Sequence, residues 1–268
     1  SNIVVKTTLK KNGIQSKNKK FTRSAVKVVE LSKLAQSGSA SSISISDGLT
    51  YNPYYGLRVQ DDQISLNVPD VAKVLVVYES TNTANPILDV IEFSSISNVG
   101  TDAIIGENII GSESGTVARV VTNNTSTPSS GGANKLGVVY LNQNTFTAGE
   151  TVTFKESNII STVQSITLGK YNNVTNNYVL DGGQKNEYYD YSRLIRTTDS
   201  EPSKRLLVVF DHYIVPASDT GDVFTVLSYD ADRFLNDIPT IGPNNVRASD
   251  TLDFRPRVDD YSSTTASP

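Results

Sequence analysis

The chain has 268 residues, a net charge of −4 and a single histidine, and it contains no cysteine, methionine or tryptophan. Without cysteine, a disulfide framework, a thiolate zinc site, an iron–sulfur cluster and a cysteine nucleophile are excluded. No apolar run approaches the roughly 20 residues of a membrane span. The acidic balance argues against a nucleic-acid surface. Lacking an initiator methionine, the sequence is expected to be a processed chain or a fragment of a larger one.

Residues 1–44 are predicted to form an extended N-terminal arm and linker. Within it, residues 25–36 fit a helix or a strand, and we expect a strand. The arm is basic, which is typical either of a solvated extended segment, the interpretation we favour, or of a contact with an acidic partner or nucleic acid. The basic residues are Lys6, Lys10, Lys11, Lys17, Lys19, Lys20 and Arg23.

Residues 45–98 are predicted to form a compact β unit. Ile64, Leu66 and Val68 alternate with polar residues, which indicates a half-buried strand that ends at Pro69. Residues 73–79 are typical of a central strand. A turn at 82–86 then predicts that residues 87–93 return and pair with that strand as a hairpin.

Residues 99–169 contain an internal repeat with an offset of 43 residues. Gly106-Glu107 corresponds to Gly149-Glu150, and Glu113-Ser114 corresponds to Glu156-Ser157. Each copy is predicted to be a Gly-Glu turn, a strand, a polar turn and a second strand, and two such hairpins can bury one shared apolar face. Residues 122–134 are predicted to be a mobile loop and 136–141 a further strand. We therefore interpret 99–169 as an inserted, separable β module.

Residues 170–260 are predicted to form a tyrosine-rich β domain, followed by a linker or frayed end at 261–268. Its apolar run at 206–210 is typical of a buried strand. Residues 224–229 are predicted to begin another strand, and 231–236 one helical turn. Taken together, the patterns predict an all-β fold of several small β-sandwich-like or β-barrel-like modules joined by short linkers, with few short helices.

The sequence offers few routes to catalysis. It has no phosphate-binding loop, no dinucleotide fingerprint and no nucleophile elbow. His212 is interpreted as structural, and acidic turns such as Asp61-Asp62 as turn caps rather than Ca²⁺ ligands. Carboxylates among tyrosines (Asp181, Glu187, Asp190 and Asp211) leave glycoside cleavage as a weak alternative and sugar binding as a stronger one. We expect no enzymatic activity, catalytic residue, cofactor or metal.

The tyrosine-rich stretch and the DFRPR segment supply the candidate structural residues. Tyr189 is expected to face opposite to Tyr188 and Tyr191. Arg255 and Arg257 are expected on one face of a stiff segment, bracing the chain internally or docking a neighbouring subunit. With Arg193, they are expected to pair with Asp190 and Asp211. The candidates are Tyr188, Tyr189, Asp190, Tyr191, Arg193, Asp211, Asp253, Arg255 and Arg257.

Three stretches carry a resemblance: TYNPYYGLRVQDDQISLNVPDVAKVLVVYES, NNYVLDGGQKNEYYDYSRL with LLVVFDHY, and IP…DTLDFRPRV. Over about residues 45–260, the chain resembles a large virion structural protein of marine contractile-tailed cyanophages. The Gly-Glu modules also look like small β inserts common in such proteins. Between residues 238 and 253 the chain is shorter and less aromatic than the family pattern.

The resemblance implies a piece of a longer virion protein, located in the tail or baseplate and made in the host cytoplasm, that carries a phage domain of unknown function. The implied partners are other tail and baseplate proteins in a symmetric, multi-copy assembly, with no nucleic acid and no membrane. A receptor-binding or carbohydrate-binding module at the tail periphery is the alternative, and a cell-wall hydrolase is a weaker third.

Overall fold

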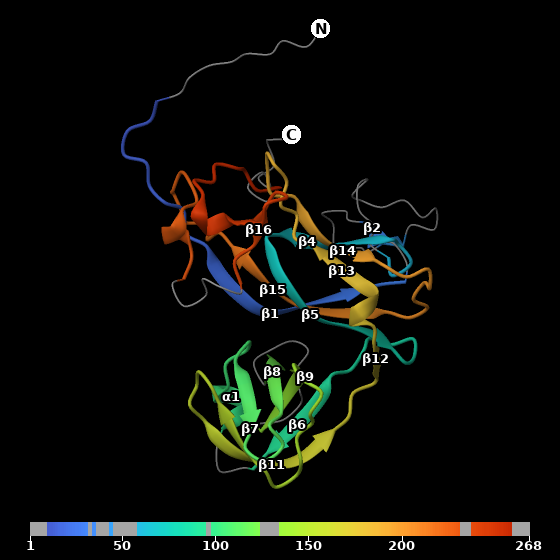
Figure 1. Ribbon diagram of the computed structural model, residues 1–268. Coiled ribbons are helices and arrows are strands. Elements are labelled where there is room, and N and C mark those ends of the chain that lie inside the picture. The colour runs from blue at the N-terminus through green and yellow to red at the C-terminus, as the bar shows by residue number, and fades with distance from the viewer. Residues whose placement is uncertain are drawn as a thin grey trace.

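A computed structural model describes residues 10–31, 34–35, 43–44, 58–94, 98–123, 134–230 and 237–258. Within these ranges the regular structure is almost entirely strand, and the single α-helix, α1 (Val99–Asp102), has four residues. The predicted all-β fold is therefore confirmed. Figure 1 shows two bodies, a sandwich above and a barrel below. The helical turn expected at 231–236 lies outside the described residues.

Two sheets form the sandwich. In the larger sheet the order is β1-β15-β5-β12, and in the smaller it is β13-β14-β4. Apolar side chains from both sheets meet in one core, including Ile64, Val77, Leu194, Val208 and Phe210. The strands are β1 (Lys20–Val29), β4 (Gln63–Pro69), β5 (Val71–Ser80), β12 (Tyr171–Asn173), β13 (Tyr178–Asp181), β14 (Tyr191–Arg196) and β15 (Leu206–Ile214).

β15 lies at the centre of the larger sheet because nearly all of its nine residues are buried. It pairs with β1 on one side and β5 on the other, both antiparallel. The predicted buried strand at 206–210 and the predicted strand at 73–79 are thus confirmed, and of the strand expected at 25–36 residues 25–29 belong to β1. Short pairs complete this body: β2 (Leu34–Ala35) with β3 (Ile43–Ser44), and β16 (Thr240–Ile241) with β17 (Val246–Arg247).

Six strands close into the barrel in the order β10-β11-β6-β9-β8-β7. Its interior is filled by buried apolar residues such as Ile91, Ile109, Leu136, Val152 and Phe154. Closure leaves no free sheet edge in this body. The strands are β6 (Asp89–Phe93), β7 (Asn108–Gly111), β8 (Val117–Thr122), β9 (Lys135–Tyr140), β10 (Thr151–Phe154) and β11 (Ile160–Thr167).

The 43-residue repeat becomes an approximate two-fold arrangement in the barrel. β7 and β10 are equivalent strands and pair with each other, Gly111 with Val152 and Phe154 with Ile109. Two buried glutamates cross between the copies. The Glu107 carboxylate accepts hydrogen bonds from the backbone N–H groups of Glu156 and Ser157, and the Glu150 carboxylate accepts from the N–H and hydroxyl of Ser114. Each copy therefore caps the polar turn of the other.

The partner of residues 87–93 differs from the expected one. These residues do not pair with β5. Instead β6 pairs with β11 on one side and with β9 on the other. The barrel thus includes a strand that precedes residue 99, so excision of 99–169 would remove five strands and leave the sixth unpaired. The apolar face of β6 is satisfied by the barrel interior, where Ile91 and Phe93 are completely buried.

The barrel contacts the sandwich through an apolar joint between the outer faces of β5 and β15 and the strands β8 and β9. Polar contacts lie beside it: Arg23 of β1 pairs with Glu156, and Gly106, with φ +89°, lies so close to Arg23 that a Cβ there would stand 2.5 Å from the Arg23 Cβ. The apolar joint consists of Val76, Tyr78, Leu88, Val121, Val139, Leu207 and Val209.

Two further expectations need correction. Residues 226–228 form a 3-10 turn, η2 (Val226–Ser228), rather than the start of a strand, because the Thr225 hydroxyl accepts from Leu227 N–H and Ser228 caps the N–H of Thr225. Residues 10–19 of the basic arm are held against the body: Lys17 N–H donates to the Val223 carbonyl at 2.8 Å, and Lys11 pairs with Asp222.

Candidate assembly site: a buried tyrosine, arginine and carboxylate cluster

Lys19, immediately before β1, lies at the centre of a buried polar cluster. Its ammonium group is 2.6 Å from the Asp70 carboxylate and donates to the hydroxyls of Tyr189 (3.1 Å) and Tyr229 (2.9 Å). It also stands 4.5 Å from the ring centroid of Phe224, a cation–π distance. All three ammonium donors are used, so the lysine has the partners that complete burial requires.

Asp70 is the main carboxylate of the cluster. It occupies the turn between β4 and β5 with a φ of +62°, and it is completely buried. Besides Lys19, it accepts from Gln184 Nε2 at 2.9 Å and lies 3.3 Å from an Arg257 guanidinium nitrogen. One carboxylate therefore joins the N-terminal segment, the loop before β14 and the C-terminal segment.

The second carboxylate of the cluster, Asp253, is bonded by Tyr189 and Arg255. The buried Tyr189 hydroxyl donates to Asp253, and Arg255 forms two bonds with the same carboxylate, at 2.9 and 2.7 Å. The Arg255 guanidinium is stacked on the Tyr189 ring, with 4.3 Å between its central carbon and the ring centroid. Arg255 also donates to the Lys185 carbonyl and to Gln184, so it is held on several sides.

Burial controls the protonation equilibria of this cluster. It lowers the pKa of Lys19, an effect that Asp70 opposes, and it raises the pKa of Tyr189 and Tyr229. Burial also tends to raise the pKa of Asp253, but hydrogen bonds from Arg255 and Tyr189 prevail and lower it. The tyrosines therefore stay neutral donors at physiological pH, and Asp253 stays an ionised acceptor.

The structure brings together some of the candidate residues and separates others. Tyr189, Asp253, Arg255 and Arg257 belong to the cluster. Tyr189 is buried and Tyr188 is 43% exposed, so these two face opposite ways as predicted. Arg255 and Arg257 act as an internal brace.

The expected pairing of the candidate arginines with Asp211 is wrong, because Arg119 and Lys73 are the cations beside that carboxylate. Asp190 does interact with Arg193: burial raises the pKa of the Asp190 carboxyl, and the charge of Arg193 opposes that rise. Arg193 pairs with Asp181 at 2.7 Å, Arg255 with Asp253 and Arg257 with Asp70. Asp190 accepts from the adjacent N–H of Tyr191, the first residue of β14. Arg255 therefore pairs with a carboxylate two positions away, whereas Arg193 and Arg257 pair with carboxylates 12 and 187 positions away, which the fold brings to them.

Asp211 belongs to a different place, the joint between sandwich and barrel. A bulge in β1 directs the Ser24 N–H onto its carboxylate at 2.8 Å. Arg119 of the barrel lies 3.5 Å away and Lys73 of β5 lies 3.7 Å away. The carboxylate is completely buried, and through Arg119 it contributes an ionic contact across the joint.

The sequence interpretation missed Lys19, Asp70, Gln184 and Tyr229. The sequence places Lys19 in the basic arm that we interpret as solvated, and it gives Asp70 no assigned role. The only local signal for Asp70 is its place between two predicted strands, since Asp is one of the residues that tolerate the left-handed conformation in a tight turn. No local signal indicated that Lys19 would be its partner, 51 positions away.

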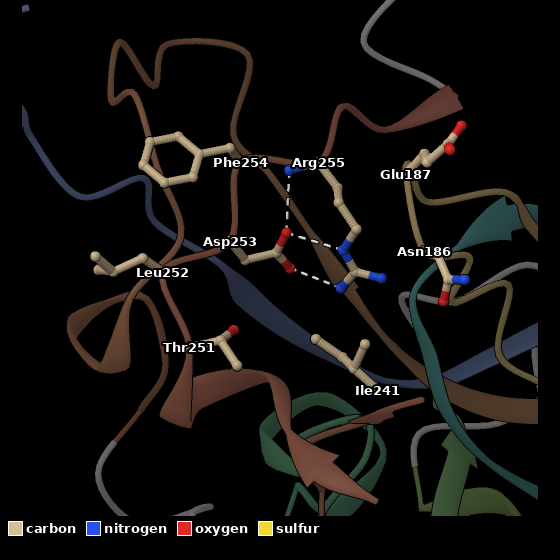
Figure 2. A pocket seen from close by; sticks show the side chains of 8 residues that line it. All are labelled: Asn186, Glu187, Ile241, Thr251, Leu252, Asp253, Phe254 and Arg255. Carbon is tan, nitrogen blue, oxygen red and sulfur yellow. Dashed lines mark hydrogen bonds and ion pairs between the residues drawn. The ribbon is translucent and has the colours of Figure 1, made fainter. Parts of the chain in front are cut away.

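An open hollow of about 510 Å³ lies beside the cluster, lined in part by Asn186, Glu187 and Ile241. Figure 2 shows that Asp253 and Arg255 point inward and bond each other, whereas Leu252 and Phe254 project to the other side of the same segment. Leu252 is 69% exposed and Phe254 is 64% exposed. One extended segment thus alternates between bracing residues and exposed apolar residues.

Comparisons with known proteins add no relative: no protein-family model, curated protein or solved structure matches this chain. No helix within the described ranges is long and apolar enough to cross a membrane. In the same ranges, no group of three or more His, Asp or Glu side chains is arranged to hold a metal ion.

Proposed function

We propose that this chain is a structural component of a phage virion, in the contractile tail or baseplate, that acts by docking other subunits. The observation that carries the proposal is the segment 252–255. Its inward residues are locked into a buried ionic cluster, while its outward residues Leu252 and Phe254 are presented to solvent. Exposed apolar side chains on a rigid base are typical of protein–protein contacts.

The exposed side chains extend onto a neighbouring segment. Phe224 pairs with Asp253 through backbone hydrogen bonds, and the turn that follows exposes Val226 (46%) and Leu227 (77%). We call Val226, Leu227, Leu252 and Phe254 the C-terminal patch. The resemblance of the tyrosine core and of DFRPR to the cyanophage family agrees with this interpretation, because those motifs build the base of the patch.

Carbohydrate binding at the tail periphery is the second candidate. The hollow in Figure 2 is lined by a carboxylate, an amide and a hydroxyl from Glu187, Asn186 and Thr251, and the exposed ring of Phe254 lies at its margin, on the other side of segment 252–255. Such a combination suits a sugar, whose apolar face covers a ring while its hydroxyls bond polar groups. In this case the chain would serve adsorption to the host rather than assembly.

The test compares particle assembly with host adsorption for Phe254→Asp. A charge in the C-terminal patch is expected to reduce incorporation of the chain into particles at least tenfold, because it would have to be buried in the contact. Ile160→Asp is the control, because it also replaces an exposed apolar side chain by a carboxylate, at a 67% exposed site on the barrel. If Phe254→Asp is incorporated normally but the particles no longer adsorb to the host, the assembly proposal is wrong and carbohydrate binding takes its place.

A further inference from the structure

One edge of the larger sheet is only partly covered. β12 pairs with β5 at Tyr78–Ser80 alone, and Val77 is bonded by Val174 and Thr175. Along residues 72–76, β5 has β15 on one side, and among the described residues no strand pairs with the other side. Residues 72–75 are all partly exposed, although the remainder of the strand on both sides is largely buried.

A hollow of about 280 Å³ with a mixed lining adjoins this edge. Its apolar lining includes Ala72, Val74 and Val77 of β5 and Tyr178 and Leu180 of β13, and its polar lining is Lys73, which also bonds Asp237 at 2.6 Å, and Thr175. β13 is itself the outer strand of the smaller sheet. As far as the described residues go, the sandwich is therefore open on this side, with the edges of two sheets facing a partly apolar space. We call this region the open side.

The polar backbone groups and the apolar space of the open side favour an extended polypeptide as the ligand. An uncovered strand edge offers alternating N–H and C=O groups that an added strand satisfies directly. Side chains two positions apart on that strand point the same way, so two aliphatic groups can enter the space between the sheets. A helix satisfies its own backbone and would leave the edge unpaired.

We propose that residues 1–9 of a second copy of this chain bind the open side as an added strand. The segment reads SNIVVKTTL, in which Ile3, Val4, Val5, Thr7 and Thr8 are β-branched and favour strands. The uncovered stretch of five residues spans about 17 Å, and nine extended residues reach about 30 Å. Ile3 and Val5 would enter the hollow, and Val4 would face the other way.

A second copy is proposed to supply the strand because the described residues that follow this segment lie at the opposite edge of the sheet. β1 is the outer strand on the far side of β15, and residues 15–19 run from it along Val223 and Ser228. Bound in this way, each copy would hold the next. The inference rests on the proposed function to the extent that a virion assembly places several copies side by side.

The absence of cysteine in the sequence makes disulfide trapping specific. A Val5→Cys chain is mixed with a larger, tagged Val74→Cys chain under mild oxidation. We expect a disulfide-linked heterodimer that excess synthetic peptide of residues 1–9 suppresses at least fivefold. Val4→Cys, on the opposite face of the added strand, and Thr101→Cys, on the barrel, are expected to give no more product than random collision.

Two results would overturn the inference. The first is that Val5→Cys gives no more disulfide-linked heterodimer than Val4→Cys does. Ile3→Cys must give an equally low yield, because a shift of the added strand by two residues would place Ile3 where Val5 is expected. The other is a disulfide formed only within a single chain that carries both cysteines. Since the purified chain is used without other virion proteins, failure here leaves the Phe254→Asp particle test unaffected. Removal of residues 1–9 provides a second measurement and should abolish self-association in sedimentation velocity.

Discussion

Burial at the scale of single residues explains why polar side chains of this protein are so tightly bonded. Tyr189 is completely buried, so its hydroxyl must be satisfied internally, and it accepts from Lys19 while donating to Asp253. An unsatisfied buried hydroxyl costs about 1–3 kcal/mol. The cluster therefore tolerates only side chains that complete the same network, which accounts for its dense mixture of Tyr, Arg and Asp.

Lys27 of β1 shows the opposite situation, because burial lowers the pKa of its amine and, among the described residues, no carboxylate opposes that effect. It lies opposite Val208 in β1, on the face that also carries Ala25 and Val29 toward the sandwich core. Burial lowers the pKa of Lys27 to about 8. A charged group that points inward from an outer strand discourages edge-to-edge association of that strand, at a cost in stability.

Lys27 therefore gives a pH-dependent prediction. Because its folded pKa lies below the unfolded value of 10.5, the folded state binds fewer protons, and its contribution to stability rises between about pH 8 and pH 10.5. At pH 7, Lys27→Met should raise the free energy of unfolding by about 1–3 kcal/mol. Urea unfolding of both chains at pH 7 and 9.5 measures this. A difference that does not shrink at pH 9.5 contradicts the prediction.

At the scale of elements, the barrel depends on the exchange of turn caps between its two repeats. Glu107 and Glu150 are both buried, and each holds the polar turn of the other copy as well as a backbone N–H beside its own turn, at Ile104 and Thr147. Charge-assisted bonds of this kind are about twice as strong as neutral ones. The two copies are thereby coupled, and neither hairpin is complete alone.

Because the two copies are coupled, replacing either glutamate should reduce the stability of the barrel by a similar amount. Glu107→Ala and Glu150→Ala should each destabilise the barrel by about 2–4 kcal/mol, because three or more donors lose their acceptor. Hydrogen exchange should show faster opening of β7, β8, β10 and β11 in both variants. Glu113→Ala, at an exposed position of the same repeat, is the control and should stay within about 0.5 kcal/mol. A loss confined to one hairpin would contradict the coupling.

At the scale of the whole molecule, the barrel joins the sandwich through one of two equivalent turns. Gly106 is buried against Arg23, whereas its counterpart Gly149, with a φ of +93°, has no atom within 4 Å of where a Cβ would lie. The surfaces differ accordingly. Val121, on the side toward the sandwich, is buried, and the equivalent Gln164 is exposed. Local symmetry is therefore broken by docking.

Substituting each of these two glycines in turn distinguishes the effect of backbone strain from the effect of the contact between barrel and sandwich. Gly106→Ala and Gly149→Ala impose similar positive-φ strain, about 1 kcal/mol, but only Gly106→Ala also places a methyl group against Arg23. We expect Gly106→Ala to loosen the barrel from the sandwich, seen as a larger radius of gyration in small-angle scattering and faster exchange of the Ser24 N–H. If both variants behave alike, Gly106 does not hold the joint.

The sequence by itself determined features that depend on neighbouring residues along the chain. The alternation at Ile64 and Leu66 predicted β4, and the apolar run at 206–210 predicted β15. The 43-residue offset predicted two equivalent hairpins around a shared core, which the barrel confirms. These signals are reliable because strand periodicity and turn chemistry act over a few residues.

Only the tertiary structure decided which distant groups meet. Residues 87–93 have strand character in any context, but the barrel interior rather than β5 provides the face that buries Ile91. Lys19 meets Asp70 because the start of β1 and the start of β5 both pair with the end of β15, a placement no local pattern encodes. A buried charged side chain needs an opposite charge within about 3 Å. For Lys19 the packed backbone places Asp70 at that distance, so the fold rather than the local sequence determines the partner.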